Sequence, residues 1–392
     1  MKKMNLKRLW YVPVLLATAS LTACLDSGDE TIVLEEGTIS IAGIPSDDLA
    51  DPNPEITTPT TTIPNVNYTF EYEGDDAILR LDMTGVQDPN SEDGWLNLVG
   101  TGGNGANKQN IWVSLDGKPK GIAVYNNSEN EGDHVLLTDV VFLVDNSGSM
   151  SEEANAIARD IVNWASTLAS SNLDVRFGCV GYDGTLSGAL DLTDVSALSA
   201  YLNRSTGTSR TRGFFGANAS SLQSAASQYS TGYSECGVAA LRFADEHFTA
   251  FRNGASRIYV NFTDEPNQPT GNANWSVNYV NNQNQWNAAK GTIHTVYSDA
   301  NTSYTERVNY EEYPWRLSEY TGGTKLFTSS SFTGVTLNDL PVTGAMQNSY
   351  IIRFTNIRDL MDGQTHEVKV TILSEDGTVQ GEKTFYIVFP EA

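Results

Sequence analysis

Cysteine and histidine are scarce in this chain of 392 residues, which has three cysteines and four histidines. The histidines are scattered and none forms an HExxH pair, which excludes that type of zinc protease. The segment GYSEC lacks the last glycine of the G-x-S-x-G turn that presents a nucleophilic serine. The sequence has no phosphate-binding glycine loop, no CxxC pair and no repeat of solenoid length. These absences favour a binding or structural protein over an enzyme.

Basic residues are also few. The chain has 24 Lys and Arg against 48 Asp and Glu, a formal net charge of -24. Four of the basic residues, Lys2, Lys3, Lys7 and Arg8, lie in the leader, so its removal leaves 20 against 48, or -28. So acidic a protein repels phosphate backbones, and no basic patch interleaved with aromatic residues is present. Nucleic acid is therefore not expected as a partner.

The apolar run near the N-terminus, about Leu9 to Leu21, is too short for a transmembrane helix and is typical of an export signal. It ends in the tetrapeptide LTAC, which resembles the lipobox of bacterial lipoproteins. The resemblance implies a signal peptide over residues 1–23, cleavage before Cys24 and lipid attachment to that cysteine. Leu25 stands where an inner-membrane retention signal would place Asp, so we expect a lipid-anchored protein of the outer membrane or the cell surface.

Residues 24–64 are acidic and rich in Thr and Pro, with few large apolar side chains. Such a composition buries too little apolar surface to offset the cost of ordering the chain. We predict an extended tether that holds the folded part away from the membrane.

Short alternating segments separated by Gly, Asn and Asp fill residues 65–132 and 345–392 and predict β-strands at both ends of the folded part. Each region alone has few strands for a sandwich. One hypothesis is a single β-sandwich built from both regions, with the middle of the chain inserted between them. Two separate small β-modules are the alternative.

The most informative stretch is DVVFLVDNSGSM, from Asp139 to Met150. Its apolar half predicts a strand buried on both faces, and helical spacing begins near Ser151. Asp145, Ser147 and Ser149 alternate in the loop between the two. A carboxylate and two hydroxyl groups at the end of a parallel strand suit a hard divalent cation, which prefers oxygen ligands.

This strand, DxSxS loop and helix together resemble the metal-ion-dependent adhesion site of the von Willebrand factor type A (VWA) domain family. The resemblance covers about residues 133–344. It implies an α/β fold, with a doubly wound, Rossmann-like and mostly parallel sheet. Together with the strands predicted at both ends, the chain would then have this α/β fold inserted into, or flanked by, a β-sandwich. It also implies a bound Mg²⁺, with Mn²⁺ or Ca²⁺ as alternatives.

Two further ligand positions follow from the same resemblance. Asp264, at the end of the apolar strand in RIYVNFTDE, matches the second aspartate of the family. The family places a Thr before the next helix, whereas this chain has Ser234 and Glu235 there, and which of them coordinates is left open. A carboxylate at this position adds negative charge, so the ion would attract an acidic group of a partner less strongly.

Cys179 and Cys236 belong to an exported chain, so a disulfide between them is allowed. Two independent buried thiols are the alternative, because sequence alone does not show whether the two residues come within bonding range.

Two loops are candidates for partner contacts. The first, Arg204 to Glu235, is long and locally basic, and it includes Arg210, Arg212, Phe214 and Phe215. The second, Asn267 to Asn284, includes Trp275, and its Asn, Trp and Tyr content also suits glycans.

Together these observations predict an envelope lipoprotein that binds a protein or glycan partner through a divalent metal ion. Two alternatives remain. In one, the chain is an assembly subunit of an envelope or pilus-like complex, and the metal only stabilises its fold. In the other, it is a metal-assisted hydrolase with Glu235 as the base.

Overall fold

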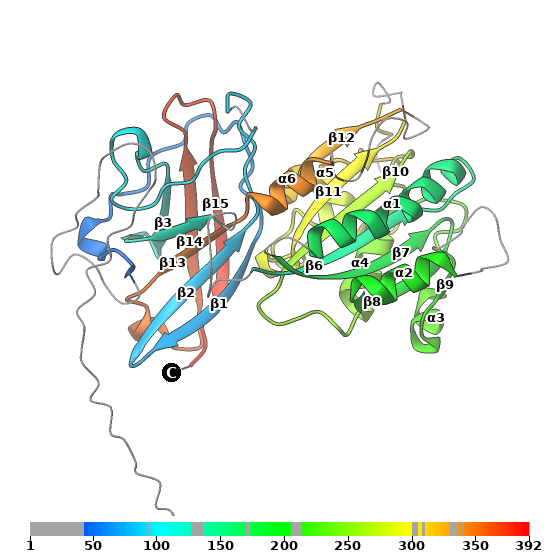
Figure 1. Ribbon diagram of the computed structural model, residues 1–392, viewed down its shortest axis with the longest axis horizontal. Coiled ribbons are helices and arrows are strands. Elements are labelled where there is room, and N and C mark those ends of the chain that lie inside the picture. The colour runs from blue at the N-terminus through cyan, green and yellow to red at the C-terminus, as the bar shows by residue number, and fades with distance from the viewer. Residues whose placement is uncertain are drawn as a thin grey trace, which may run out of the picture.

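The computed structural model describes residues 43–91, 94–126, 136–169, 173–204, 214–299, 305–307, 310–329, 336, 338 and 340–391. The predicted signal peptide and Cys24 lie outside these residues. Figure 1 shows two units side by side, one built from two small sheets and the other from a larger sheet with helices. None of the helices within the described ranges is both long and apolar enough to cross a bilayer.

The first unit consists of two antiparallel four-stranded sheets that combine strands from both ends of the chain. In order across the sheet, one contains β1 (Val66–Glu73), β2 (Asp76–Met83), β13 (Tyr350–Phe354) and β5 (Ala123–Asn126). The other contains β15 (Gln380–Val388), β14 (Thr365–Leu373), β3 (Ile111–Leu115) and β4 (Lys118–Lys120). Because β13 lies between β2 and β5, the two terminal β-regions are not separate modules.

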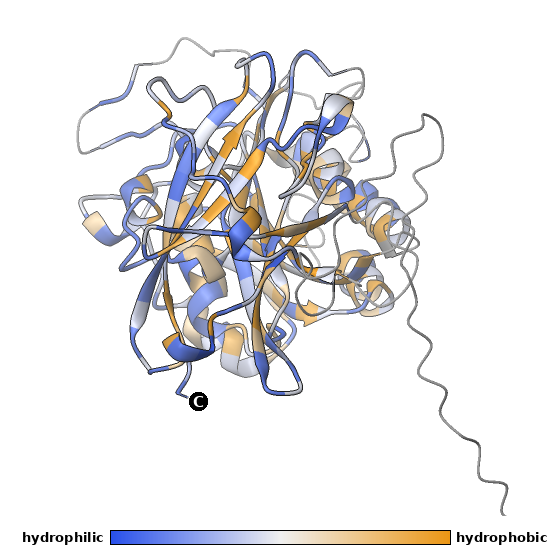
Figure 2. Ribbon diagram, turned by 90° about the vertical axis from the view of Figure 1, so that its left-hand side faces the viewer, coloured by the Kyte–Doolittle hydropathy of each residue, from blue (hydrophilic) through white to orange (hydrophobic). Residues whose placement is uncertain are grey.

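The two sheets share one apolar core. Leu81 of β2 and Ile352 of β13 belong to the same buried cluster as Val113 of β3 and Val370 of β14. Burying a side chain of this size contributes about 1.5–3 kcal/mol. Figure 2, which faces this unit, shows apolar and polar positions mixed along its strands, as expected where only one face of each sheet is buried.

Residues 43–64 pack against the first unit, although the sequence analysis assigns them to the tether. Ile44 and Ile63 are fully buried. The Asp47 carboxylate pairs with the buried Lys120 ammonium, and the Thr60 hydroxyl donates to the carbonyl of Thr378 at 2.8 Å. These contacts reach residues far along the sequence, in β4 and in the connection between β14 and β15. This part of the predicted tether is therefore part of the folded unit.

The second unit is a seven-stranded sheet in which five of the six strand pairings are parallel and the β7–β8 pairing is antiparallel. Its strands, in order across the sheet, are β12 (Lys325–Phe327), β11 (Thr292–Tyr297), β10 (Ser256–Thr263), β6 (Leu136–Asp145), β7 (Leu173–Tyr182), β8 (Leu186–Thr193) and β9 (Gly216–Ala217). The apolar run of β6 is fully buried, with Phe142 in one core and Leu143 in the other.

Six α-helices occur in the described residues. They are α1 (Ser151–Ala169), α2 (Val195–Asn203), α3 (Ser220–Ala226), α4 (Gly237–His247), α5 (Arg316–Thr321) and α6 (Pro341–Gln347). Short 3₁₀ helices are η2 (Asp47–Leu49), η3 (Gly105–Asn107), η4 (Ala273–Trp275), η5 (Val277–Tyr279), η6 (Ala288–Lys290) and η8 (Arg358–Leu360). Helix α1 packs in the core that contains Phe142, and α4 packs in the core that contains Leu143.

The predicted fold class, a doubly wound α/β protein, is wrong for this chain, which is mainly β. Fifteen strands in three sheets stand against six α-helices in the described residues, and the two terminal β-regions supply eight of those strands. The connection from β10 to β11, described throughout, contains only the 3₁₀ helices η4, η5 and η6. Its many Asn residues favour turns, because their side chains compete for backbone hydrogen bonds.

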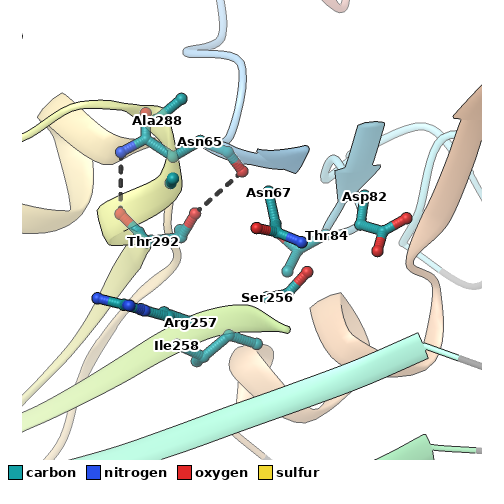
Figure 3. Close-up of a pocket in the computed structure, with 11 residues that line it drawn as sticks. Asn65, Asn67, Asp82, Thr84, Ser256, Arg257, Ile258, Ala288 and Thr292 are labelled. Carbon is teal, nitrogen blue, oxygen red and sulfur yellow. Dashed lines mark hydrogen bonds between the residues drawn. The ribbon is translucent and has the colours of Figure 1, made fainter. Parts of the chain in front are cut away.

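A small cavity lies where the two units meet (Figure 3). Asn67 and Thr84 line it from the first unit, and Ser256 and Thr292 line it from the second. Its volume of about 10 Å³ is close to what one water molecule needs. The Asn67 amide nitrogen and the Thr84 hydroxyl are buried without a hydrogen-bond partner among the described residues. The junction therefore has polar groups and space for a bridging water.

His294 in β11 makes stability depend on pH. Burial lowers the pKa of His294 to about 3, against an ordinary value of 6.5. The unfolded chain therefore binds this proton at higher pH than the folded chain, and stability is lost as the pH falls below 6.5. We expect His294 to make the free energy of unfolding about 2 kcal/mol lower at pH 5.0 than at pH 7.5.

Urea unfolding of wild type and His294→Gln at both pH values measures this contribution. The variant should show the smaller difference between the two pH values. An equal pH dependence in wild type and His294→Gln would contradict the assignment.

Candidate metal centre

The centre begins where β6 ends. The buried Asp145 is the last residue of this strand, and its Oδ1 accepts a hydrogen bond from the backbone N–H of Ser147 at 3.0 Å. The hydroxyl oxygens of Ser147 and Ser149 lie 3.0 Å apart. The loop thus folds back over the strand end and keeps three oxygen-bearing side chains together.

The neighbouring strand β10 brings Asp264 to the same place. Because β6 and β10 run parallel, with Val144 opposite Phe262, their carboxyl ends meet at one edge of the sheet. The Ser149 hydroxyl donates to Oδ1 of Asp264 at 3.2 Å, and the Thr263 hydroxyl donates to Oδ2 of Asp145 at 2.8 Å. These two bonds join segments more than a hundred residues apart in the sequence.

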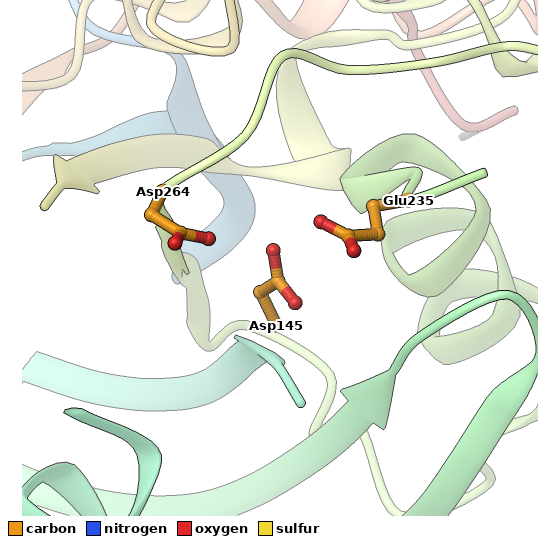
Figure 4. A group of neighbouring side chains, drawn as sticks. All are labelled: Asp145, Glu235 and Asp264. Carbon is orange, nitrogen blue, oxygen red and sulfur yellow. The ribbon is translucent and has the colours of Figure 1, made fainter. Parts of the chain in front are cut away.

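Glu235 completes the cluster from the loop before α4. Its backbone is held by Gln268: the Gln268 N–H donates to the Glu235 carbonyl at 2.8 Å, and the Glu235 N–H donates to Oε1 of Gln268 at 3.2 Å. One oxygen from each of Asp145, Glu235 and Asp264 lies within 4.8 Å of the other two. Figure 4 shows the three carboxylates pointing toward one another.

This arrangement is electrostatically costly without a positive charge. Burial, and then the neighbouring charge of Asp264, raise the pKa of Asp145. Burial, and then the charge of Asp145, raise the pKa of Glu235, and burial raises the pKa of Asp264. Two unit negative charges at such a separation repel by about 3 kcal/mol in a partly shielded protein environment. The cluster must therefore take up protons or a cation.

The donor set fits a hard divalent cation. All the converging side-chain ligands are oxygens, which suit Mg²⁺, Mn²⁺ or Ca²⁺ better than metals that prefer nitrogen or sulfur. Oε2 of Glu235 is buried and has no hydrogen-bond partner in the described part of the chain. A buried carboxylate oxygen without a donor is costly, and a coordinated cation would satisfy it.

The structure brings together Asp145, Ser147, Ser149 and Asp264, as the sequence analysis expects. Where the sequence left Ser234 and Glu235 as alternatives, the Glu235 carboxylate lies in the cluster. The backbone carbonyl of Ser234 accepts a bond from the Thr231 hydroxyl, which holds the loop.

Sequence reasoning did not single out Thr263 and Gln268, which position the Asp145 and Glu235 ligands. Thr263 could have been identified from the sequence, because it is a hydroxyl residue at the end of an apolar strand, directly before Asp264. No sequence pattern identifies Gln268, because its role depends on how two distant loops meet.

The possible disulfide between Cys179 and Cys236 does not form. Both are free, buried thiols, and they lie in different apolar cores of the seven-stranded sheet. Cys179 packs with Phe142 and α1, whereas Cys236 precedes α4 and contacts Oδ1 of Asn267 at 3.3 Å. The remaining alternative, two independent thiols, is correct.

The predicted partner contacts have different outcomes. Phe214 is fully buried in the core beside α1, so it is not a surface contact. Phe215 is exposed, and Trp275 is half-buried against the other core. Arg210 and Arg212 lie outside the described residues.

No protein-family model and no curated protein matches the chain. Among solved structures, it is similar to proximal thread matrix protein 1 from the mussel byssus, with 11% identity, 50% of this chain and 45% of that one covered, and a TM-score of 0.32.

It is also similar to the open conformation of the pilus adhesin SpaC from Lactobacillus rhamnosus GG (10% identity, 83% and 55% covered, TM-score 0.31). A third similar structure is the human COPII-coat protein Sec24c (7% identity, 70% and 47% covered, TM-score 0.31). The chain spans about half the length of these three structures. Likenesses this distant identify neither a family nor a function.

Glu235→Gln tests whether the carboxylates repel one another. In chelator at pH 7.5, the variant should have a higher free energy of unfolding than wild type, by on the order of 2 kcal/mol. Burial and the charge of Asp145 raise the pKa of Glu235 to about 9, so the folded wild type must take up a proton that the amide of the variant does not need. With saturating Mg²⁺ the wild type should gain more stability than the variant.

Urea unfolding with chelator and with Mg²⁺ provides both comparisons. Glu375→Gln, at an exposed glutamate of the first unit, is the matched control and should change neither value. If Glu235→Gln were less stable than wild type in chelator, Glu235 would have a structural role that repulsion does not describe.

Proposed function

We propose that this chain is an extracellular binding protein that uses a divalent cation to bind a protein or glycan partner. The ligands to the cation are Asp145, Ser147, Ser149, Glu235 and Asp264. The cation is Mg²⁺, with Mn²⁺ or Ca²⁺ as alternatives. When bound, it supplies a positive centre to which an oxygen atom of the partner coordinates.

One observation carries this proposal: three carboxylates from three segments converge within 4.8 Å at one edge of a sheet, beside the two serine hydroxyls. A cation held only to stabilise the core does not require exposed ligands. Here Ser149 is exposed and Asp264 is half-buried, so the cluster opens to the surface. The resemblance of the DxSxS loop to a metal-dependent adhesion site supports the same function.

The proposal includes the location of the protein. The leader and the LTAC tetrapeptide support a lipid anchor at Cys24, which would hold the chain on the outer membrane or the cell surface. The residues between Cys24 and the folded unit would then form the connection to the membrane.

Partner capture with and without metal tests this function. The full chain is immobilised and exposed to a panel of extracellular-matrix proteins and oligosaccharides, in Mg²⁺ and then in chelator. We expect binding in Mg²⁺ that falls at least about tenfold in chelator and in Asp145→Asn, because a coordinated oxygen contributes a charge-assisted contact. Glu375→Asn, far from the cluster in the first unit, should bind as wild type.

Thermal unfolding of the same samples separates binding from folding. If chelator and Asp145→Asn lower the melting temperature but leave partner binding unchanged, the metal is only structural and the proposal fails. If Mg²⁺-dependent turnover of a bound partner is observed and is lost in Glu235→Gln, the chain is a metal-assisted hydrolase instead.

A further inference from the structure

A second cavity lies on the loop that leads away from the metal centre. It has a volume of about 490 Å³, within the range of about 300–1,000 Å³ that is usual for small-molecule sites. Its wall includes Pro269 and Gly271, at the start of the β10–β11 connection, and Glu312. The site described above does not use this cavity.

Amide side chains belong to four of the ten residues that line the cavity. Asn272, Asn278, Asn282 and Gln285 all line it, and the three asparagines are exposed. The Asn278 side-chain oxygen accepts a bond from the Tyr320 hydroxyl at 3.4 Å, and that of Asn282 accepts one from the Asn284 N–H at 3.0 Å. These bonds orient the two amide groups. Their NH₂ groups have no hydrogen-bond partner among the described residues and are therefore available as donors.

The acidic side chain that lines the cavity, Glu312, already has hydrogen-bond donors for its carboxylate. Both carboxylate oxygens of Glu312 accept bonds, from the Ser276 hydroxyl at 2.5 Å, the Val277 N–H at 2.7 Å and the Asn267 amide at 2.9 Å. Glu312 therefore holds the loop in place. The other polar side chains that line the cavity are neutral, and the amide NH₂ groups among them suit hydroxyl and carbonyl oxygens.

The cavity and the metal centre share one short segment. Pro269 follows Asp264 by five residues, so their Cα atoms lie at most about 18 Å apart even if the chain is fully extended. Gln268, between them, is hydrogen-bonded to Glu235. One extended ligand can therefore reach both places.

The charge of the metal centre favours a neutral ligand. Three carboxylates carry one more negative charge than a divalent cation neutralises. A carboxylate from a partner would add a further negative charge beside this excess, whereas a sugar hydroxyl adds none. Tyr233, two residues before Glu235, is fully exposed and offers an aromatic face to an apolar sugar surface.

We propose that the ligand is an uncharged carbohydrate, and that the cavity lined by Asn278 and Asn282 is a subsite for it. This inference rests on the proposed function, because the metal centre would hold one part of the same ligand. The amide donors of the cavity bind sugar hydroxyls, and the cation binds hydroxyls at the other end of the ligand.

An oligosaccharide array tests the inference with the full chain in Mg²⁺. The array presents neutral oligosaccharides of glucose, galactose and mannose beside uronic-acid and sialylated ones, and a peptide containing Asp. We expect binding to neutral oligosaccharides. The double variant Asn278→Asp and Asn282→Asp keeps the acceptor oxygens but removes the amide donors, and should weaken binding by about tenfold.

Asn287→Asp is the control, because it adds a negative charge to the same connection outside the cavity wall, and it should bind as wild type. Binding to the acidic peptide or acidic sugars alone, or unchanged binding by the double variant, would overturn the inference. A calorimetric Mg²⁺ titration of each variant separates the two proposals. If the array overturns the carbohydrate inference but Mg²⁺ still binds, only that inference fails. If wild type takes up no metal ion, the proposed function fails whatever the array shows.

Discussion

The parallel pairing of β6 with β10 is the constraint on which the candidate site depends. Because Val144 lies opposite Phe262, the next residues of both strands reach the same edge of the sheet. Asp145 and Asp264 are thereby brought together although they are 119 positions apart in the sequence. The register is itself fixed by burial on both faces, since a slip of one residue would exchange the two apolar cores. Repulsion between the carboxylates is a consequence of a register that the core imposes.

The two units have different parts in this account. The first unit combines both ends of the folded chain, and its core is separate from the two cores of the seven-stranded sheet. The metal centre and the amide-lined cavity both belong to the second unit. The segment from Asp264 to Gly271 connects these two features, and Gln268 joins it to the Glu235 loop. A ligand that spans both would therefore contact one continuous edge.

The parts of the site that could be predicted are those encoded locally. The apolar run of β6, followed at once by Asp145, Ser147 and Ser149, is visible in the sequence because strand and loop are contiguous. Asp264 is visible for the same reason, at the end of β10. Glu235 was one of two alternatives, because its place depends on where α4 begins relative to the sheet.

The predictions that were wrong or left open depend on contacts between segments that are far apart in the sequence. The packing of residues 43–64 depends on partners such as Lys120, more than seventy positions away from Asp47. The tether was predicted from the composition of this segment alone. The predicted fold class was wrong because the strands from the two ends of the chain outnumber the α-helices in the described residues. In addition, the turn-rich β10–β11 connection forms no α-helix. The pairing of Cys179 and Cys236 was left undecided because the sequence does not show on which side of the sheet Cys179 of β7 and the loop residue Cys236 pack.

Calorimetric titration of the full chain with Mg²⁺, Mn²⁺ and Ca²⁺ tests the central claim most directly, because it measures the cation itself. The account predicts that one ion binds per chain to wild type, and that binding is lost in Asp264→Asn, with the fold unchanged by circular dichroism. Failure of a folded wild-type chain to take up any of the three ions at millimolar concentration would contradict it.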